Sequence, residues 1–197
     1  MRKLVLASKN KGKVVELKEI LVSLPLEVVG LDGFPDAPEV KETGRTFMEN
    51  AILKARTIGD FTGELTLADD SGLEVDALNG EPGVYSARYG QPGWDDRDRY
   101  RFLLENLQSV PLEKRTARFR CAVALYNPEN GQLCQADGTV EGIILDESRG
   151  ANGFGYDPVF LITELGKTMA ELTAEEKNRF SHRARAVEKL IPILEKL

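Results

Sequence analysis

The sequence contains few of the residues on which disulfide-rich and zinc-binding proteins depend. Its 197 residues include two cysteines, Cys121 and Cys134, and a single histidine, His182. Two cysteines cannot form a disulfide framework in a chain of this size, and one histidine adds too little for a Cys/His zinc site. We therefore expect no zinc chemistry, and we expect both cysteines to be small residues of the core.

Long hydrophobic runs and an excess of positive charge are also missing. No uncharged apolar stretch approaches the roughly 18 residues of a membrane span, and the apolar stretch after Lys3 reaches only Lys9, which is too short for a signal-peptide core. The 32 acidic and 26 basic residues leave a net charge of -6, which argues against non-specific binding to nucleic acid or anionic membranes. We expect a cytoplasmic protein with no nucleic-acid or membrane partner.

What the sequence does contain is typical of a soluble globular protein. Hydrophobic residues make up 42% and charged residues 29% of the chain, and neither repeats nor a long linker interrupt it. We therefore expect residues 1–197 to form a single domain.

Helical and strand patterns alternate along this domain, which predicts the α/β class. Capping boxes at Thr46/Glu49 and Thr173/Glu176, and a cap at Ser181, mark helix starts. Strands are predicted at 3–7, 26–29, 65–68, 73–75 and 159–162, with a hairpin around 127–131, and helices at 14–24, 47–58, 100–107 and 184–194.

A basic segment joins the first strand to the first helix. The N-terminus of a helix offers free N–H groups and a positive dipole end, both of which favour an anion. The segment is not a P-loop, because Ala7 stands at the first glycine position and Val14 follows the last lysine. Either it binds phosphate in another way or it is a solvated turn with Ser8 or Asn10 as the helix cap. Its residues are Ser8, Lys9, Asn10, Lys11, Gly12 and Lys13.

Two adjacent carboxylates, Asp69 and Asp70, follow an apolar strand. Neighbouring strand residues face opposite sides, so the two are not expected to share one role. One could bind Mg²⁺ or orient water, since hard oxygen ligands suit magnesium and its phosphate substrates. An isolated Asp-Asp-Ser-Gly sequence is more often an acidic turn. Glu42 is a further possible metal ligand, although it carries no signal by itself.

The C-terminal half offers two weaker candidates. Phe154 to Asp157 follows a Gly-rich loop and combines an aromatic platform with a carboxylate, which suits a purine base but fits core packing equally well. His182 at a helix start is more often a capping or packing residue than a catalyst. Ser181 has no nucleophile-elbow sequence around it.

Together these segments resemble the non-canonical purine nucleoside triphosphate pyrophosphatases, the inosine/xanthosine triphosphatase family. The resemblance runs in order over almost the whole chain. Its motifs are Ser8-x-Asn10-x-x-Lys13, Glu42-Thr43-Gly44, Phe47-x-Glu49-Asn50-Ala51-x-x-Lys54-Ala55, Ala68-Asp69-Asp70-Ser71-Gly72-Leu73, Pro82-Gly83-x-Tyr85-Ser86-Ala87-Arg88, Gly153-Phe154-Gly155-Tyr156-Asp157-Pro158, Lys177 and Ser181-His182-Arg183.

The resemblance implies an elongated mixed β-sheet with flanking helices, two lobes around a nucleotide cleft, and a homodimer. The implied activity is Mg²⁺-dependent hydrolysis of ITP, dITP and XTP to the monophosphate and pyrophosphate. By position, Asp70 would be the catalytic and metal residue, Glu42 a second metal ligand, and Ser8 to Lys13 the triphosphate loop. Substrate contacts would come from Ser71, Phe154, Gly155, Tyr156, Asp157, Lys177, His182 and Arg183.

One departure from the family pattern lies in the first loop. Lys9 and Lys11 make it more basic than the commoner Thr-Gly-Asn form, which bears on triphosphate affinity and leaves the reaction type unaffected. Three other interpretations stay open: a P-loop kinase or GTPase, a nucleotide-binding module without hydrolysis, and a structural protein. The two P-loop mismatches count against the first, and the carboxylates count against the second. A structural role would leave the ordered polar motifs unexplained.

Overall fold

The computed structural model describes residues 1–196, and over these residues the chain forms one seven-stranded mixed sheet in the order β2-β1-β3-β4-β5-β6-β7. The sheet with its helices confirms the predicted α/β class. The strands are β1 Arg2–Leu6, β2 Leu26–Val29, β3 Leu65–Val75, β4 Thr116–Asn127, β5 Gln132–Ile144, β6 Phe160–Ile162 and β7 Lys167–Thr168. The helices are α1 Lys11–Ile20, α2 Phe47–Thr62, α3 Asp96–Asn106, α4 Ala174–Phe180, α5 His182–Glu188 and α6 Ile191–Leu194.

The described part of the chain divides into two compact units. Unit 1 contains Met1–Asp70, Cys121–Gly138 and the chain from His182 onward, and unit 2 contains Ser71–Arg120 and Thr139–Ser181. Each unit has a hydrophobic cluster of its own.

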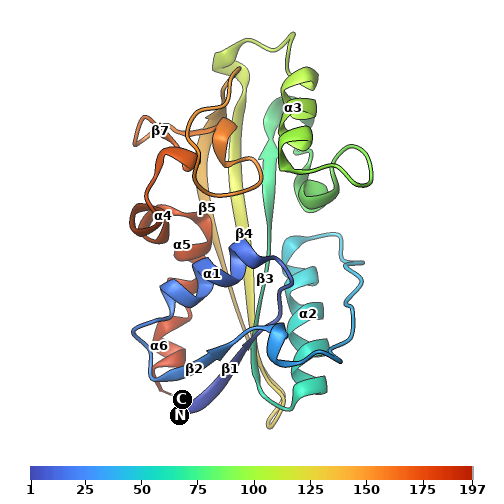
Figure 1. Ribbon diagram of the computed structural model, residues 1–197, viewed down its shortest axis with the longest axis vertical. Helices are drawn as coiled ribbons and strands as arrows, with labels where there is room; N and C mark the ends of the chain where they lie inside the picture. The colour runs from blue at the N-terminus through green and yellow to red at the C-terminus, as the bar shows by residue number, and fades with distance from the viewer. Residues whose placement is uncertain (197) are drawn as a thin grey trace. The chain divides into compact units, whose positions relative to one another are not determined.

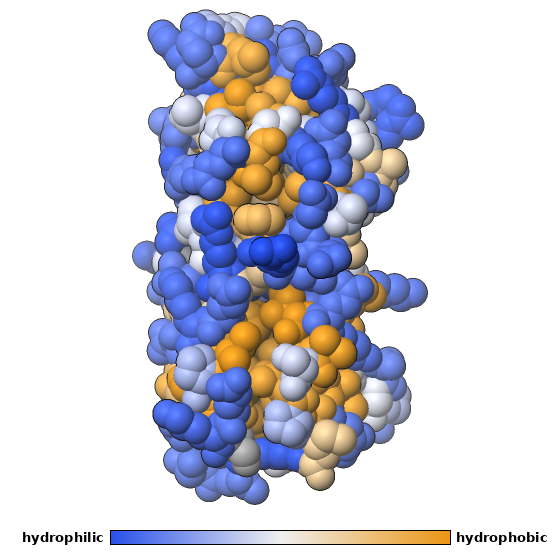
Figure 2. All heavy atoms as spheres, turned by 90° about the vertical axis from the view of Figure 1, so that its left-hand side faces the viewer, coloured by the Kyte–Doolittle hydropathy of each residue, from blue (hydrophilic) through white to orange (hydrophobic). Residues whose placement is uncertain are grey.

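Unit 1 is built on parallel strands. β1 pairs in parallel with β2 on one side and with β3 on the other. Helix α2 lies on one side of these strands, and α1, α5 and α6 lie on the other (Figure 1). Seen from the side of α1 and α6, hydrophobic residues gather between hydrophilic ones in the lower part of Figure 2.

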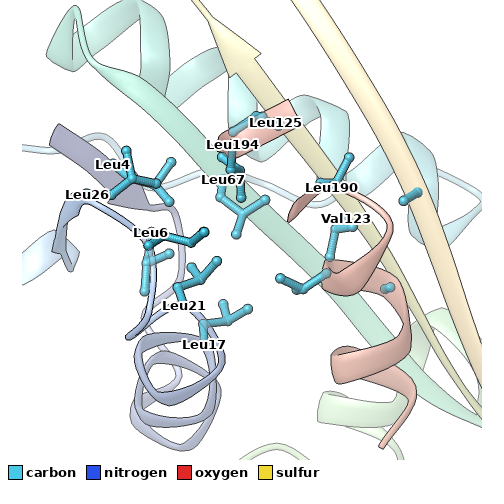
Figure 3. Packing of buried hydrophobic residues seen from close by; sticks show 14 of the residues in the cluster. Leu4, Leu6, Leu17, Leu21, Leu26, Leu67, Val123, Leu125, Leu190 and Leu194 are labelled. Atoms are coloured by element: carbon cyan, nitrogen blue, oxygen red, sulfur yellow. The ribbon is translucent and has the colours of Figure 1, made fainter. Parts of the chain in front are cut away.

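The core of unit 1 is aliphatic. In Figure 3, Leu17 and Leu21 of α1 point toward Leu4 and Leu6 of β1, and Leu190 lies near Val123 of β4. Cys121 is buried in this cluster, so the prediction that it is a core residue is confirmed, whereas Cys134 is only partly buried and packs against the edge of the cluster.

Unit 2 has antiparallel strands and a core rich in aromatic residues. β6 pairs antiparallel with both β5 and β7. The rings of Phe119 and Phe160 lie 4.6 Å apart between centroids, and the Tyr156 hydroxyl donates to the Ser86 carbonyl at 2.8 Å. Leu103 and Leu107 at the end of α3 complete the same cluster.

The two strands predicted on either side of Asp69 to Gly72 are one continuous strand, β3. The expectation of an acidic turn is therefore wrong. Asp69 and Asp70 are both buried, and each carboxylate has cationic partners on neighbouring helices. The sequence Asp69 to Gly72 is thus part of a buried strand, and its carboxylates are paired where they are buried.

The helix ends differ from the predictions in two places. The Thr46 hydroxyl accepts from the Glu49 amide as predicted. The Glu49 carboxylate, however, accepts from the backbone amide of Arg45 and not from that of Thr46, so only half of the predicted capping box forms. Helix α2 also continues through Gly59 to a left-handed cap at Gly63. The predicted final helix is interrupted between α5 and α6, since Pro192 has no N–H to continue it. The capping box of Thr173 is confirmed.

Among residues 1–196, no helix is long and apolar enough to cross a membrane.

Candidate active site

The basic segment of unit 1 forms a capped helix start. The Asn10 side chain accepts from the Lys13 amide at 3.1 Å, and the Ser8 hydroxyl accepts from the Asn10 amide at 3.3 Å. Of the two predicted cap residues, Ser8 and Asn10, the structure has Asn10 as the cap. Lys11, Gly12 and Lys13 form the first turn of α1. This geometry leaves the anion-binding interpretation intact, because the amides of a first turn point out of the helix end.

Only one lysine of this segment is held in place by a buried partner. Lys9 is largely exposed and lies 3.9 Å from Glu39, and Lys11 is exposed. The Lys13 side chain is only 14% exposed, and its Nζ lies 3.0 Å from Oδ2 of Asp69. Lys13 is thus pre-oriented, whereas Lys9 and Lys11 are free to adopt many conformations.

The two adjacent carboxylates of β3 contact helices on opposite faces of unit 1. Asp69 faces α1 and α5, where it meets Lys13 and the Nε of Arg183 at 3.2 Å. Asp70 faces α2, where it meets Asn50 and Lys54. The alternation of side chains along a strand produces this separation. The predicted opposite orientation of the two side chains is confirmed, and that they do not share one role stays a prediction.

Asp69 belongs to a buried ion-pair network. Arg183 is fully buried and also pairs with Glu16 of α1. Burial raises the pKa of Asp69, but the opposing effect of the charges of Lys13 and Arg183 is larger, so the pKa lies well below its usual range. Asp69 is therefore a permanent anion that joins α1 and α5 to β3.

Asp70 has a different environment. Asn50 Nδ2 donates to its Oδ2 at 3.1 Å, and Lys54 Nζ donates to its Oδ1 at 3.1 Å. Burial raises the pKa of Asp70, and the opposing effect of Lys54 and Lys13 does not cancel this rise. A carboxylate with a raised pKa is a better proton acceptor than an ordinary aspartate.

Lys54 connects Asp70 with the other predicted metal ligand. Its Nζ lies 2.7 Å from Oε1 of Glu42. Burial lowers the pKa of Lys54, but Asp70, Asp69 and Glu42 raise it more, so the ammonium stays charged. Glu42 and Asp70 thus share one cation.

Glu42 and Asp70 offer the hard carboxylate oxygens that a divalent cation such as Mg²⁺ prefers. Within residues 1–196, no group of three His, Cys, Asp or Glu side chains could hold a metal ion. Two carboxylates fit a cation whose other ligands come from outside the protein, such as phosphate oxygens.

Unit 2 brings together another group of predicted site residues. Lys177 of α4 is buried, and its Nζ lies 2.5 Å from Oδ2 of Asp157 and 4.6 Å from the centroid of the Phe154 ring. The same Asp157 oxygen accepts from the Phe154 amide at 2.9 Å. The neighbouring amide of Gly155 donates to Asp96 at 2.8 Å. Two adjacent backbone amides therefore fix the chain at Phe154, and Lys177 contacts its ring.

The remaining predicted residues are found in both units. Tyr156 packs in the aromatic core of unit 2, and Ser71 is a half-buried residue of β3. His182 is buried at the start of α5. Helix α5 approaches β5 closely at Gly138, where a Cβ would lie 2.2 Å from the His182 carbonyl oxygen. A glycine at this position thus lets α5 bring His182 and Arg183 against the sheet.

Comparison with known proteins shows the family to which the chain belongs. Residues 4–193 match the model of the Ham1 family. This chain belongs to the Ham1 family. It is 53% identical over 195 residues to the dITP/XTP pyrophosphatase of Desulforamulus reducens, covering 99% of this chain and 96% of the relative. The dITP/XTP pyrophosphatase of Geobacter sulfurreducens is 52% identical, over 95% of this chain and 94% of its own.

Solved Ham1 structures have the same fold. A HAM1 protein from Coxiella burnetii superposes with a TM-score of 0.90 at 43% identity, covering 100% of both chains. The Ham1 protein of Staphylococcus aureus gives a TM-score of 0.87 at 42% identity, covering 99% of both chains.

Two residues of the candidate active site had no role predicted from the sequence. Asn50 and Lys54 were seen only as parts of a motif, with no role given to either. Their spacing of four residues places both on one face of α2, and both contact Asp70. A search for polar residues at helical spacing on an otherwise apolar face would have identified them.

Proposed function

We propose that this Ham1 protein hydrolyses the non-canonical purine nucleoside triphosphates dITP, XTP and ITP to the monophosphate and pyrophosphate. The observation that carries the proposal is the pair of carboxylates, Asp70 and Glu42, held around one cationic partner on the α2 side of unit 1. The names of the curated relatives support the substrate class. The reaction removes deaminated purines from the nucleotide pool.

Hydrolysis to these products requires attack at the α-phosphorus. The water oxygen forms a bond to this phosphorus, the bond to the α,β-bridging oxygen breaks, and pyrophosphate leaves with that oxygen. Asp70 accepts the proton that the water loses, for which its raised pKa suits it. Lys54 and Lys13 offset the negative charge of the phosphates. When bound at Glu42 and Asp70, Mg²⁺ would supply further charge neutralisation.

The triphosphate is bound by the segment before α1 and by its first turn. Lys13 makes the main charge-assisted contact, because its side chain is already oriented by Asp69. Lys9 and Lys11 act through their charge, as exposed lysines do, and their effect is screened by salt. Backbone amides at the helix start complete the site, which comprises Ser8, Lys9, Asn10, Lys11, Gly12 and Lys13.

The base is recognised by an aromatic surface and by donors. Phe154 stacks on the purine, with Asp157 and Lys177 holding its loop. Hypoxanthine and xanthine carry a carbonyl at C6 where adenine carries an amino group, so donors such as His182 and Arg183 favour the first two. A donor facing an amino group costs on the order of 1–3 kcal/mol, or roughly 5- to 150-fold in discrimination. Ser71, Gly155 and Tyr156 are further proposed contacts.

The setting of the reaction is part of the same proposal. The family match over residues 4–193 supports one pyrophosphatase domain that includes both units. The net charge of -6 supports a protein that binds neither nucleic acid nor anionic membranes. A homodimer in the cytoplasm, with Mg²⁺ as the cofactor, completes the proposal.

A substrate panel tests the proposed function. Purified protein is given dITP, ITP, XTP, ATP or GTP with Mg²⁺, and pyrophosphate and orthophosphate are measured separately. We expect pyrophosphate from dITP, ITP and XTP, much less from ATP and GTP, and no activity after EDTA until Mg²⁺ is restored. Orthophosphate as the first product would indicate a phosphatase, and no turnover of any nucleotide would indicate a binding module.

A further inference from the structure

One buried asparagine connects Asp70 with the segment that carries Glu42. Asn50 lies in the first turn of α2 and is completely buried. Its Nδ2 donates to Asp70 Oδ2 at 3.1 Å, and its Oδ1 accepts from the Gly44 amide at 2.8 Å. A single side chain therefore contacts both parts of the candidate metal site.

The chemistry of these contacts fixes the orientation of the amide. The Gly44 N–H can only donate, so the Asn50 atom facing it must be the oxygen. The NH₂ group then points at Asp70, which must accept. Because Lys54 donates to the other Asp70 oxygen, the carboxylate is held at both ends.

The Glu42 segment is held against α2 at unusually short range. A Cβ added to Gly44 would lie 2.6 Å from Asn50 Oδ1 and 2.7 Å from Glu49 Cβ. Any residue larger than glycine would therefore push the amide of Asn50 away. The close approach and the hydrogen bond act together to fix this segment.

We propose that Asn50 is a positioning residue for the hydrolysis: it holds the Asp70 carboxylate in one orientation and fixes the Glu42 segment relative to it. This inference rests on the proposed function. Asn50 acts through Asp70 and Glu42 and does not itself contact the substrate. Residues that orient metal ligands in this way typically contribute about 10- to 100-fold to metal affinity or activity.

The test compares Asn50→Ala with Asn127→Ala. Asn127 is a buried asparagine of the same unit, whose side chain accepts from the Glu129 amide in the β4–β5 turn. Far-UV circular dichroism and thermal unfolding first establish that both variants are folded. We expect Asn50→Ala to lower kcat for dITP by about 10- to 100-fold. Asn127→Ala should leave kcat within about twofold, because the hydrogen bond that it removes lies in the β4–β5 turn, away from the candidate site, and affects stability alone.

Two binding measurements separate positioning from general loosening of the fold. Inorganic tripolyphosphate, measured by calorimetry in EDTA so that no metal is present, should bind Asn50→Ala as it binds the wild type, because Asn50 contacts none of the residues Ser8 to Lys13 in the hydrogen bonds described. Mn²⁺ binding in the presence of tripolyphosphate, followed by electron paramagnetic resonance, should weaken about tenfold or more.

The outcomes distinguish this inference from the proposed function. Wild-type kcat and Mn²⁺ affinity in Asn50→Ala would overturn the positioning role, and so would a loss of metal-free tripolyphosphate affinity equal to the loss of kcat. If Asn50→Ala does not fold, Gly44→Ala decides by the same measurements, because its Cβ displaces the Asn50 amide. If the wild type does not hydrolyse dITP, the proposed function fails, and the Mn²⁺ measurement still tests Asn50.

Discussion

Unit 1 buries a network of charges around one strand, whereas unit 2 buries an ion pair beside an aromatic ring. In unit 1, Asp69 and Arg183 are nearly inaccessible, and Asp70 lies on the opposite face of the same strand. In unit 2, Asp157 and Lys177 are buried next to Phe154.

The difference matches the proposed places of the phosphate contacts, which lie in unit 1, and of the surface that stacks on the base, which lies in unit 2. A triphosphate and its metal need several charges held at fixed positions, and burying a charge requires a partner for it. A purine base needs a flat surface, which an aromatic ring provides with one ion pair to hold its loop. The two hydrophobic cores also differ: the core of unit 1 is aliphatic, whereas the core of unit 2 includes the aromatic residues Phe119, Tyr156 and Phe160.

The largest effect is expected from breaking the charge network of unit 1. Arg183→Ala removes a buried cation from both Asp69 and Glu16, which should lower the free energy of unfolding by about 3–5 kcal/mol. The control Arg2→Ala removes a largely exposed ion pair with Glu129 and should cost about 0–1 kcal/mol. Urea denaturation of both variants measures the difference. Equal losses would mean that the network adds no more than a surface ion pair does.

A second test concerns activity. Asp70→Asn keeps the size of the side chain and removes its charge and basicity, so kcat for dITP should fall by at least about 100-fold while the fold survives. Asp60→Asn is the control, because Asp60 accepts a hydrogen bond from the Tyr126 hydroxyl on the exposed side of α2. Near wild-type turnover by a folded Asp70→Asn variant would remove Asp70 from the reaction.

The sequence was enough to predict the α/β fold and the opposite orientation of Asp69 and Asp70. It did not predict the continuity of β3 or the ion pairs of Arg183, for physical reasons. Alternation along a strand was enough to predict that Asp69 and Asp70 face opposite sides. The continuity of β3 was not predictable, because local turn preference of Asp69 to Gly72 is overridden by partners far away in sequence. Arg183 appeared in the motifs as a substrate contact, and only the packing of α5 reveals its ion pairs with Asp69 and Glu16.

The smallest effect is expected at the cysteines, which probe the core of unit 1. Burial raises the pKa of the Cys121 thiol to about 12, so at pH 8 almost none of it is the reactive thiolate. Iodoacetamide should therefore modify the half-buried Cys134 in the folded protein and reach Cys121 only after unfolding in urea. Peptide mass spectrometry gives both yields from one sample. Modification of Cys121 in the native protein at the rate of Cys134 would contradict a closed core.

The most direct test of the division between the units is a crossed comparison of Lys13→Ala and Phe154→Ala. For each variant, three quantities are measured: the affinity for inorganic tripolyphosphate, KM for dITP, and the ratio of kcat/KM for dITP to that for dATP. We predict that Lys13→Ala weakens tripolyphosphate binding and leaves the ratio unchanged, while Phe154→Ala leaves tripolyphosphate binding unchanged and raises KM for dITP by roughly 5- to 150-fold. If both variants weaken tripolyphosphate equally, or if Phe154→Ala leaves KM for dITP at the wild-type value, the assignment of the phosphates to Lys13 and of purine stacking to Phe154 is wrong.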